Sequence, residues 1–253
     1  MAVTNALNNG AIGIIGGIGP QASAWLHTQL VRKAATANTE LGLEFPQIVH
    51  FSVRVPPFIR EGSDQQRAIR LVSHAARSLV NSGATTIGLA CNTAHILLPE
   101  VEARTGITVE RIPEQVRRVV QDEGLERVGL LATQETIDRG LYGTVSDVAE
   151  LIIPTPELTA IVEKHIVGVY TGAHSASDSA AFRELVCQFR DHYQLDSVIF
   201  GCTELPVAYG EGERTGIVDT LDVLADHLLA EFHLAVASTG TGEFAVAITG
   251  TGE

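Results

Sequence analysis

The sequence predicts an α/β protein with two pseudo-symmetric domains, each built on an open parallel sheet, and a ligand site in the cleft between them. Three observations predict this fold. Strand-like apolar segments alternate with helix-like segments along the chain, an order typical of parallel sheets covered by helices. The strand–turn–helix pattern starts again near residue 126. A cysteine also follows a buried strand in each half, in GLACNTAH and in VIFGCTELP.

The first half opens with an apolar strand that ends in a glycine-rich turn, GGIGP. A helix follows, with Pro20 near its first turn, where proline is favoured. The turn lacks the full GxGxxG spacing, so it does not indicate a nucleotide site. The other elements expected in this half are a strand at 47–53, a proline-broken loop at 54–64, a helix at 65–82 and a strand at 85–90.

The second half repeats this order. Strand, turn and helix are expected within 126–142, a helix at 181–194, a strand at 197–200, and then a short strand followed by the last helix. We expect a first domain of residues 1–114 plus 216–238 and a second domain of residues 115–215. The segment 239–253 contains TGTGE twice and is expected to be a flexible tail without an assigned function.

Composition excludes several classes of protein. The 253 residues carry 17 Lys and Arg against 30 Asp and Glu, a formal net charge of −13, and only 5% aromatic residues. Such a chain is a poor general binder of nucleic acid or of an anionic membrane. Because no apolar run reaches about 18 residues, we expect no transmembrane helix, and because the first residues lack a basic start and an apolar stretch, we expect no signal peptide. Three widely spaced cysteines fit a reducing cytoplasm, and no spacing indicates a metal site.

Cys91 and Cys202 are the candidate catalytic residues. A free cysteine is usually a small buried hydrophobic residue, and Cys187, inside the helical run RELVCQF, fits that interpretation. Cys91 and Cys202 instead follow strands at the start of helical turns, where a helix N-terminus lowers the pKa of a thiol. Two such thiols across one cleft can act as a base and an acid on opposite faces of one carbon atom.

The polar neighbours of the two cysteines have two interpretations. Asn92, Thr93 and Thr203 are typical helix caps, and they can also present donors to a carboxylate; both can hold at once. His95 is expected to pack rather than to polarise the site. Glu204 is expected to orient a neighbouring group or to interact with the helix dipole.

Arg54 and Arg60 lie in the proline-rich loop after the second strand. An arginine there can bind a distal substrate carboxylate through two hydrogen bonds, or it can belong to a solvated loop. Both interpretations remain open at the level of sequence.

Four segments carry a family resemblance: IIGGIGPQAS, GLACNTAH, GLLATQETIDRGLY and VIFGCTELP, in this order between residues 12 and 206. Together they resemble the aspartate/glutamate racemase family, the cofactor-independent amino-acid racemases, and the GGxGP opening resembles its aspartate-racemase-like branch. The resemblance implies two α/β domains with the C-terminal helix returning to the first. It also implies Cys91 and Cys202 as the two catalytic bases, with no pyridoxal phosphate and no other cofactor.

The same resemblance implies the substrate-binding residues. Asn92, Thr93, Thr136 and Thr203 would surround the α-carboxylate and amine, and Ile18 would line the pocket. Arg60 would take the place of the arginine in the specificity loop, although here the loop reads SVRVPPFIRE rather than Asn-Pro…Asp-Arg. The expected activity is racemisation of an acidic amino acid, aspartate before glutamate. Because family members are commonly dimers, a homodimer is also expected.

Two other kinds of function remain open. One is a related enzyme on the same scaffold: a hydantoin racemase, a maleate isomerase or an arylmalonate decarboxylase. The decarboxylase reaction needs one cysteine, and the maleate reaction would form a covalent adduct on one. The other is a non-catalytic protein that binds a small acid, which would need no pair of cysteines.

Overall fold

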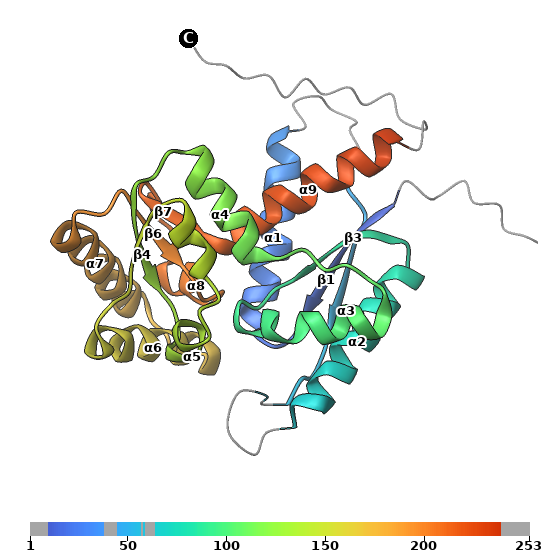
Figure 1. Cartoon of the computed structure of the whole chain (residues 1–253), viewed down its shortest axis with the longest axis horizontal. Helices are drawn as coiled ribbons and strands as arrows, with labels where there is room; N and C mark the ends of the chain where they lie inside the picture. Colours follow the sequence, from blue (N-terminus) through green and yellow to red (C-terminus); the bar gives the residue numbers. More distant parts are fainter. Residues whose placement is uncertain (1–9, 38–44, 57, 59–63, 239–253) are drawn as a thin grey trace, which may run out of the picture.

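The computed structural model describes residues 10–37, 45–56, 58 and 64–238. These residues form two lobes, each around one parallel sheet (Figure 1). The tail expected at 239–253 lies outside the described residues, and so does Arg60.

The first sheet has the strand order β2-β1-β3, and all its pairings are parallel. An isolated parallel bridge from Gly88 to Glu110 extends it beyond β3. The strands are β1 (Ala11–Gly16), β2 (Ile48–Ser52) and β3 (Ala84–Leu89). Around them lie α1 (Pro20–Ala37), α2 (Gln65–Asn81), the 3₁₀ helix η1 (Thr93–Leu97) and α3 (Leu98–Thr105).

The second sheet has the order β5-β4-β6-β7, again entirely parallel. It repeats the first sheet, with β4 in the place of β1, β6 in the place of β3, and β7 in the place of the bridge at Glu110. Its strands are β4 (Arg127–Leu131), β5 (Glu150–Ile152), β6 (Ser197–Phe200) and β7 (Ile217–Asp219). Its helices are α5 (Gln134–Asp138), the 3₁₀ helix η2 (Gly143–Asp147), α6 (Pro156–Thr171), α7 (Ala176–Tyr193) and α8 (Leu205–Tyr209).

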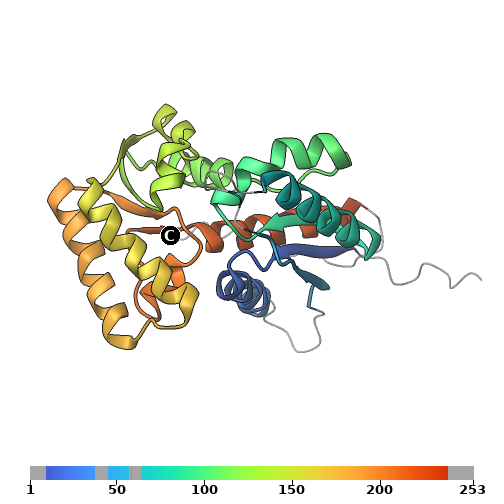
Figure 2. The same cartoon turned by 90° about the horizontal axis from the view of Figure 1, so that it is seen from below.

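Two helices, α4 (Ile112–Asp122) and α9 (Thr220–Ser238), lie between the lobes together with α1 (Figures 1 and 2). Their apolar residues share one buried cluster with residues of β1 and β4, so the two halves have a common core. Helix α9 packs directly on β3: a methyl group added at Gly88 would lie 2.8 Å from Cδ1 of Leu228. Each half also has one further apolar cluster of its own.

These observations confirm the predicted α/β fold with parallel sheets. The helix predicted at 181–194 begins earlier, at Ala176, because Ser175 and Asp178 form a capping box there. The domain boundaries stay a prediction. Segment 216–238 was expected to belong to the first domain, but in the structure its two elements lie against different sheets. Strand β7 pairs with β6 in the second sheet, whereas α9 covers the first sheet. No helix within the described ranges is both long and apolar enough to span a membrane.

Candidate active site

Cys91 and Cys202 lie at matching places in the two halves. Cys91 follows β3 and Cys202 follows β6, at the carboxyl ends of the strands, where open α/β sheets bind ligands. Cys202 is buried and Cys91 is partly buried. A negative charge on Cys91 raises the pKa of Cys202, so the two thiols lie within range of each other's charge.

The expectation that the pKa values of the two thiols are lowered overall is wrong for the structure described here. Backbone N–H groups of Thr93 and Ala94 do act on Cys91 and lower its pKa, but burial and the Glu204 carboxylate outweigh them and raise that pKa to about 12. The same two causes raise the pKa of Cys202 well above its ordinary value. Both thiols are therefore protonated at neutral pH, because the uncharged form is favoured where water is excluded.

Cys187 is correctly predicted to lie in a helix, but the expectation that it is buried is wrong. It lies in α7 and is exposed. The buried side of that helix is formed by Phe182, Val186 and Phe189 instead. Cys187 therefore has no part in the site.

The Glu204 carboxylate lies beside the side chains of Cys202 and Thr203. The Cys202 thiol donates a hydrogen bond to its Oε2 atom at 3.1 Å, and the Thr203 hydroxyl donates to the same atom at 3.2 Å. On the other side, a Cβ atom added at Gly19 would overlap Oε1 of Glu204. The turn after β1 thus lies directly against a buried carboxylate that accepts a hydrogen bond from Cys202.

Threonine hydroxyls join the two halves beside the cysteines. Thr93, from the first half, hydrogen-bonds Thr136, from the second, with 3.0 Å between their Oγ1 atoms. Thr133 caps α5 and donates to the Thr136 hydroxyl at 3.0 Å. The structure thus brings together Thr93 and Thr136, two of the residues that the sequence analysis expected in the site, and adds Thr133.

The side chain of Asn92 is occupied by two residues that the sequence analysis missed. Its Oδ1 atom accepts a hydrogen bond from the Tyr142 hydroxyl at 2.5 Å, and its Nδ2 atom donates to Thr220 Oγ1 at 3.1 Å. Tyr142 ends the segment GLLATQETIDRGLY, and its hydroxyl was a usable signal, because a buried tyrosine needs a hydrogen-bond partner. Thr220 offered no comparable signal.

His95 has the structural role that was expected. Its Nε2 atom accepts a hydrogen bond from the backbone N–H of Ile112, which leaves Nδ1 to donate to the carbonyl oxygens of Cys91 and Asn92. Burial lowers the pKa of His95 to about 4, so the ring is neutral. It holds the turn that carries Cys91.

The remaining predicted site residues are Ile18 and the arginines of the loop after β2. Ile18 is partly buried and packs against the apolar cluster of the first half, as Cys91 does. Arg54 is exposed in the segment after β2. Because Arg60 lies outside the described residues, binding of a distal carboxylate by this loop stays a prediction.

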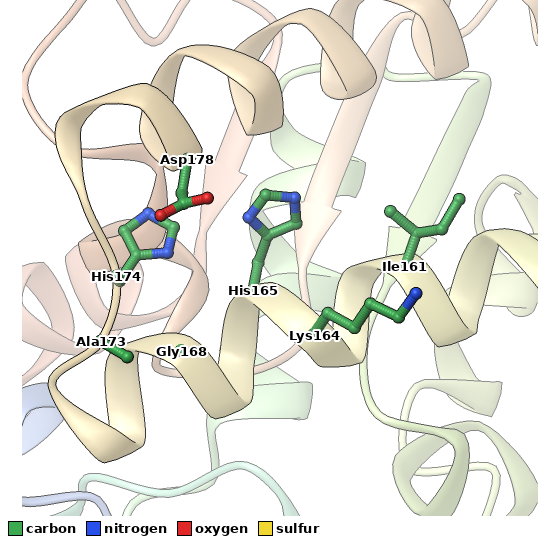
Figure 3. Close-up of a pocket in the computed structure, with 7 residues that line it drawn as sticks. All are labelled: Ile161, Lys164, His165, Gly168, Ala173, His174 and Asp178. Carbon is green, nitrogen blue, oxygen red and sulfur yellow. The ribbon is translucent and has the colours of Figure 1, made fainter.

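One cavity of about 320 Å³ lies in the second half, and another of about the same volume lies between the second half and Gln21 of α1; neither is lined by a cysteine. Figure 3 shows one of them, where His165 projects from α6 towards His174 and Asp178. The residues around the cysteines are instead closely packed: Asn92, Thr136 and Thr203 are each 1% exposed, whereas Cys91 itself is partly exposed.

No cluster of three or more His, Cys, Asp or Glu side chains suitable for a metal ion occurs in the part of the chain that the structure describes.

Comparison with known proteins gives consistent matches. The family model for Asp/Glu/Hydantoin racemase matches residues 15–228. The broad specificity amino-acid racemase RacX of Bacillus subtilis is 22% identical over 198 residues, which cover 77% of this chain and 85% of that protein. A glutamate racemase of Glaesserella parasuis is 27% identical over 130 residues, 49% of this chain and 46% of that protein.

Solved structures agree with these sequence matches. The aspartate racemase of Picrophilus torridus superposes with a TM-score of 0.70 at 25% identity, covering 88% of this chain and 95% of that one. A glutamate racemase from Francisella tularensis, solved with D-glutamate, gives a TM-score of 0.62 at 18% identity, covering 94% and 85%. Since the family model spans most of the chain, this protein belongs to the Asp/Glu/Hydantoin racemase family.

Proposed function

We propose that this protein is a cofactor-independent racemase of an acidic amino acid, with aspartate the first candidate and glutamate the second. The observation that carries the proposal is the pair of thiols, Cys91 and Cys202, at equivalent strand ends in a racemase-family chain and within range of each other's charge. An enzyme that inverts a stereocentre by proton transfer needs one base and one acid on opposite faces of the carbon.

The proposed reaction uses both thiols and Glu204. Glu204 accepts the proton of Cys202, and the resulting thiolate removes the α-proton of the substrate. The Cys91 thiol then donates its proton to the opposite face, which leaves a thiolate on Cys91. Proton exchange with solvent restores the starting state, and the reverse reaction runs in the opposite order.

Substrate binding would supply a positive charge near the two thiols. The ammonium group of an amino acid would lower the pKa of both thiols, because an opposite charge nearby favours the ionised form. Backbone N–H groups of the cysteine turns and the hydroxyls of Thr93, Thr136 and Thr203 would hold the α-carboxylate and stabilise the carbanion-like state. Ile18 would line the pocket, and Arg60 would hold the side-chain carboxylate. Cytoplasmic location and a homodimer stay predictions.

NMR in D₂O tests this proposal. L- and D-aspartate, L- and D-glutamate, several neutral amino acids and a hydantoin are incubated with the protein without pyridoxal phosphate. We expect loss of the α-proton signal of an acidic amino acid together with appearance of its enantiomer. Exchange on the hydantoin alone would replace the proposed substrate class, and binding without any exchange would support a non-catalytic role.

Substitution of the cysteines tests the mechanism. We expect Cys91→Ser and Cys202→Ser each to lower racemisation by about 10²- to 10⁴-fold, the usual contribution of a general acid or base, measured by polarimetry or chiral chromatography. Cys187→Ser is the matched control, since Cys187 is exposed on α7, and it should keep full activity. Full two-way turnover by either of the first two variants would contradict the two-base mechanism.

A further inference from the structure

A buried chain of hydrogen bonds connects the turn of Cys91 with the strand that leads to Cys202. Tyr142 donates to Asn92 at 2.5 Å, Asn92 donates to Thr220 at 3.1 Å, and Thr220 donates to the carbonyl oxygen of Phe200 at 2.8 Å. Asn92 directly follows Cys91, and Phe200 lies two residues before Cys202. These hydrogen bonds therefore connect the half that carries Cys91 with the half that carries Cys202.

The members of this chain are withdrawn from solvent. Asn92 and Tyr142 are each 1% exposed, and Thr220 is fully buried. Their polar groups therefore depend on one another, because a buried polar group that loses its partner is destabilised. Oδ1 of the Asn92 amide accepts from Tyr142 and Nδ2 donates to Thr220, so both polar ends of this side chain have partners within the protein.

We propose that Asn92, Tyr142 and Thr220 form a positioning network that fixes the separation and orientation of the two thiols. The inference rests on the proposed racemase activity. Proton transfer on both faces of one carbon requires two groups at a set distance, and misplacement by about 1 Å can cost about 10²-fold in rate. A network that joins the two strand ends controls this distance.

The steady-state parameters separate positioning from binding. Tyr142→Phe and Thr220→Val keep the shape of each side chain and remove one hydroxyl. We expect kcat to fall by about 10- to 100-fold while KM changes by less than about twofold. A rise in KM at unchanged kcat would overturn the proposal, because it would assign the network to substrate binding. Unchanged values of both would overturn it as well.

Two further variants exclude a general loss of packing. Thr220→Ser restores the hydroxyl and should recover most of the kcat that Thr220→Val loses. Tyr209→Phe is the matched control, because it removes a tyrosine hydroxyl that donates to the carbonyl of Glu213 at 3.0 Å, outside the network, and it should keep kcat. Equal loss in Thr220→Ser and Thr220→Val, with both variants folded by circular dichroism, would count against positioning.

A measurement that needs no turnover distinguishes failure of this proposal from failure of the racemase assignment. In a Cys187→Ser background, the rate of Cys91 alkylation by iodoacetamide is followed against pH by mass spectrometry. Tyr142→Phe should change the rate at a given pH by at least about fivefold, and Tyr209→Phe should not. If the wild-type protein shows no racemase activity and this difference in alkylation rate still appears, the network is supported without the activity. If the difference in alkylation rate is absent, the network is refuted.

Discussion

At the scale of single residues, the reactivity of Cys91 is set by opposing effects. Backbone N–H groups of Thr93 and Ala94 favour the thiolate, whereas burial and the Glu204 carboxylate oppose it, and the opposing effects are larger. The thiol is thus held in its protonated form, which is the less reactive one, since the thiolate is the nucleophile.

Alkylation kinetics should reveal this balance. At pH 7.5 we expect iodoacetamide to modify the exposed Cys187 before Cys91, and the rate at Cys91 to rise steadily as the pH increases. Glu204→Gln removes the negative charge that raises the Cys91 pKa, so it should accelerate alkylation of Cys91 by about 3- to 10-fold at a fixed pH. Glu123→Gln, at an exposed position, is the control. Equal rates at Cys91 and Cys187 would contradict the protonated state.

At the scale of elements, the turn between β1 and α1 is shaped to fit the turn after β6. Gly19 leaves space for the Glu204 carboxylate, which in turn accepts hydrogen bonds from Cys202 and Thr203. A glycine-rich turn that does not fit a nucleotide motif thus has a structural explanation: close approach of a backbone to a buried acid.

Gly19→Ala tests this fit. The added methyl group would displace the Glu204 carboxylate from Cys202, so we expect racemase activity to fall by about tenfold or more, with a stability loss of about 1–3 kcal/mol from overpacking. Activity and thermal unfolding are measured together. In Gly168→Ala, the control, the new methyl group makes only ordinary contacts, 3.5 Å or more, with His174, and activity should persist. Wild-type activity in Gly19→Ala would show that the displacement has no functional effect.

The elements themselves were largely predictable from sequence, and the contacts between halves were not. Strands such as β3 and β6 are apolar runs bounded by polar turns, a local signal. The Thr93–Thr136 and Asn92–Tyr142 hydrogen bonds join residues with no periodic relation, because they depend on how two lobes meet. The resemblance placed both threonines at the site, but the role of the Asn92 amide required the three-dimensional arrangement.

At the scale of the whole molecule, Arg214 links both halves through several contacts. Its guanidinium lies 5.5 Å from the ring centre of Trp25 in α1 and 5.8 Å from that of Tyr209 in α8. It also pairs with Asp219 at the end of β7 and donates to the carbonyl oxygen of Pro206 at 3.0 Å. The helix after Cys202 is thereby held against the helix after the glycine-rich turn.

Asp219 should make the stability of this arrangement depend on pH. Burial raises its pKa to about 6, although Arg214 acts in the opposite direction. A carboxyl group with a raised pKa in the folded state contributes stability below its unfolded pKa, and this contribution is lost as the pH rises through the folded value. We expect the free energy of unfolding of the wild type, relative to Asp219→Asn, to fall by up to about 3 kcal/mol between pH 4 and pH 7.

Urea unfolding at a series of pH values measures this difference. The exposed Asp147 provides the control: the gap between wild type and Asp147→Asn should change little over the same range. A constant gap between wild type and Asp219→Asn would show that Asp219 has an ordinary pKa in the folded protein.

The packing of α9 on β3 has a consequence for biosynthesis. Gly88 is in contact with a helix that the ribosome makes only after the entire second half. Until α9 emerges, the nascent first half carries a sheet with part of one apolar face uncovered, because α1 covers only the rest of it, and exposed apolar surface promotes aggregation. Because α9 follows the second half in the sequence and covers a sheet made before it, a chain that stops before Thr220 should depend on chaperones to stay in solution.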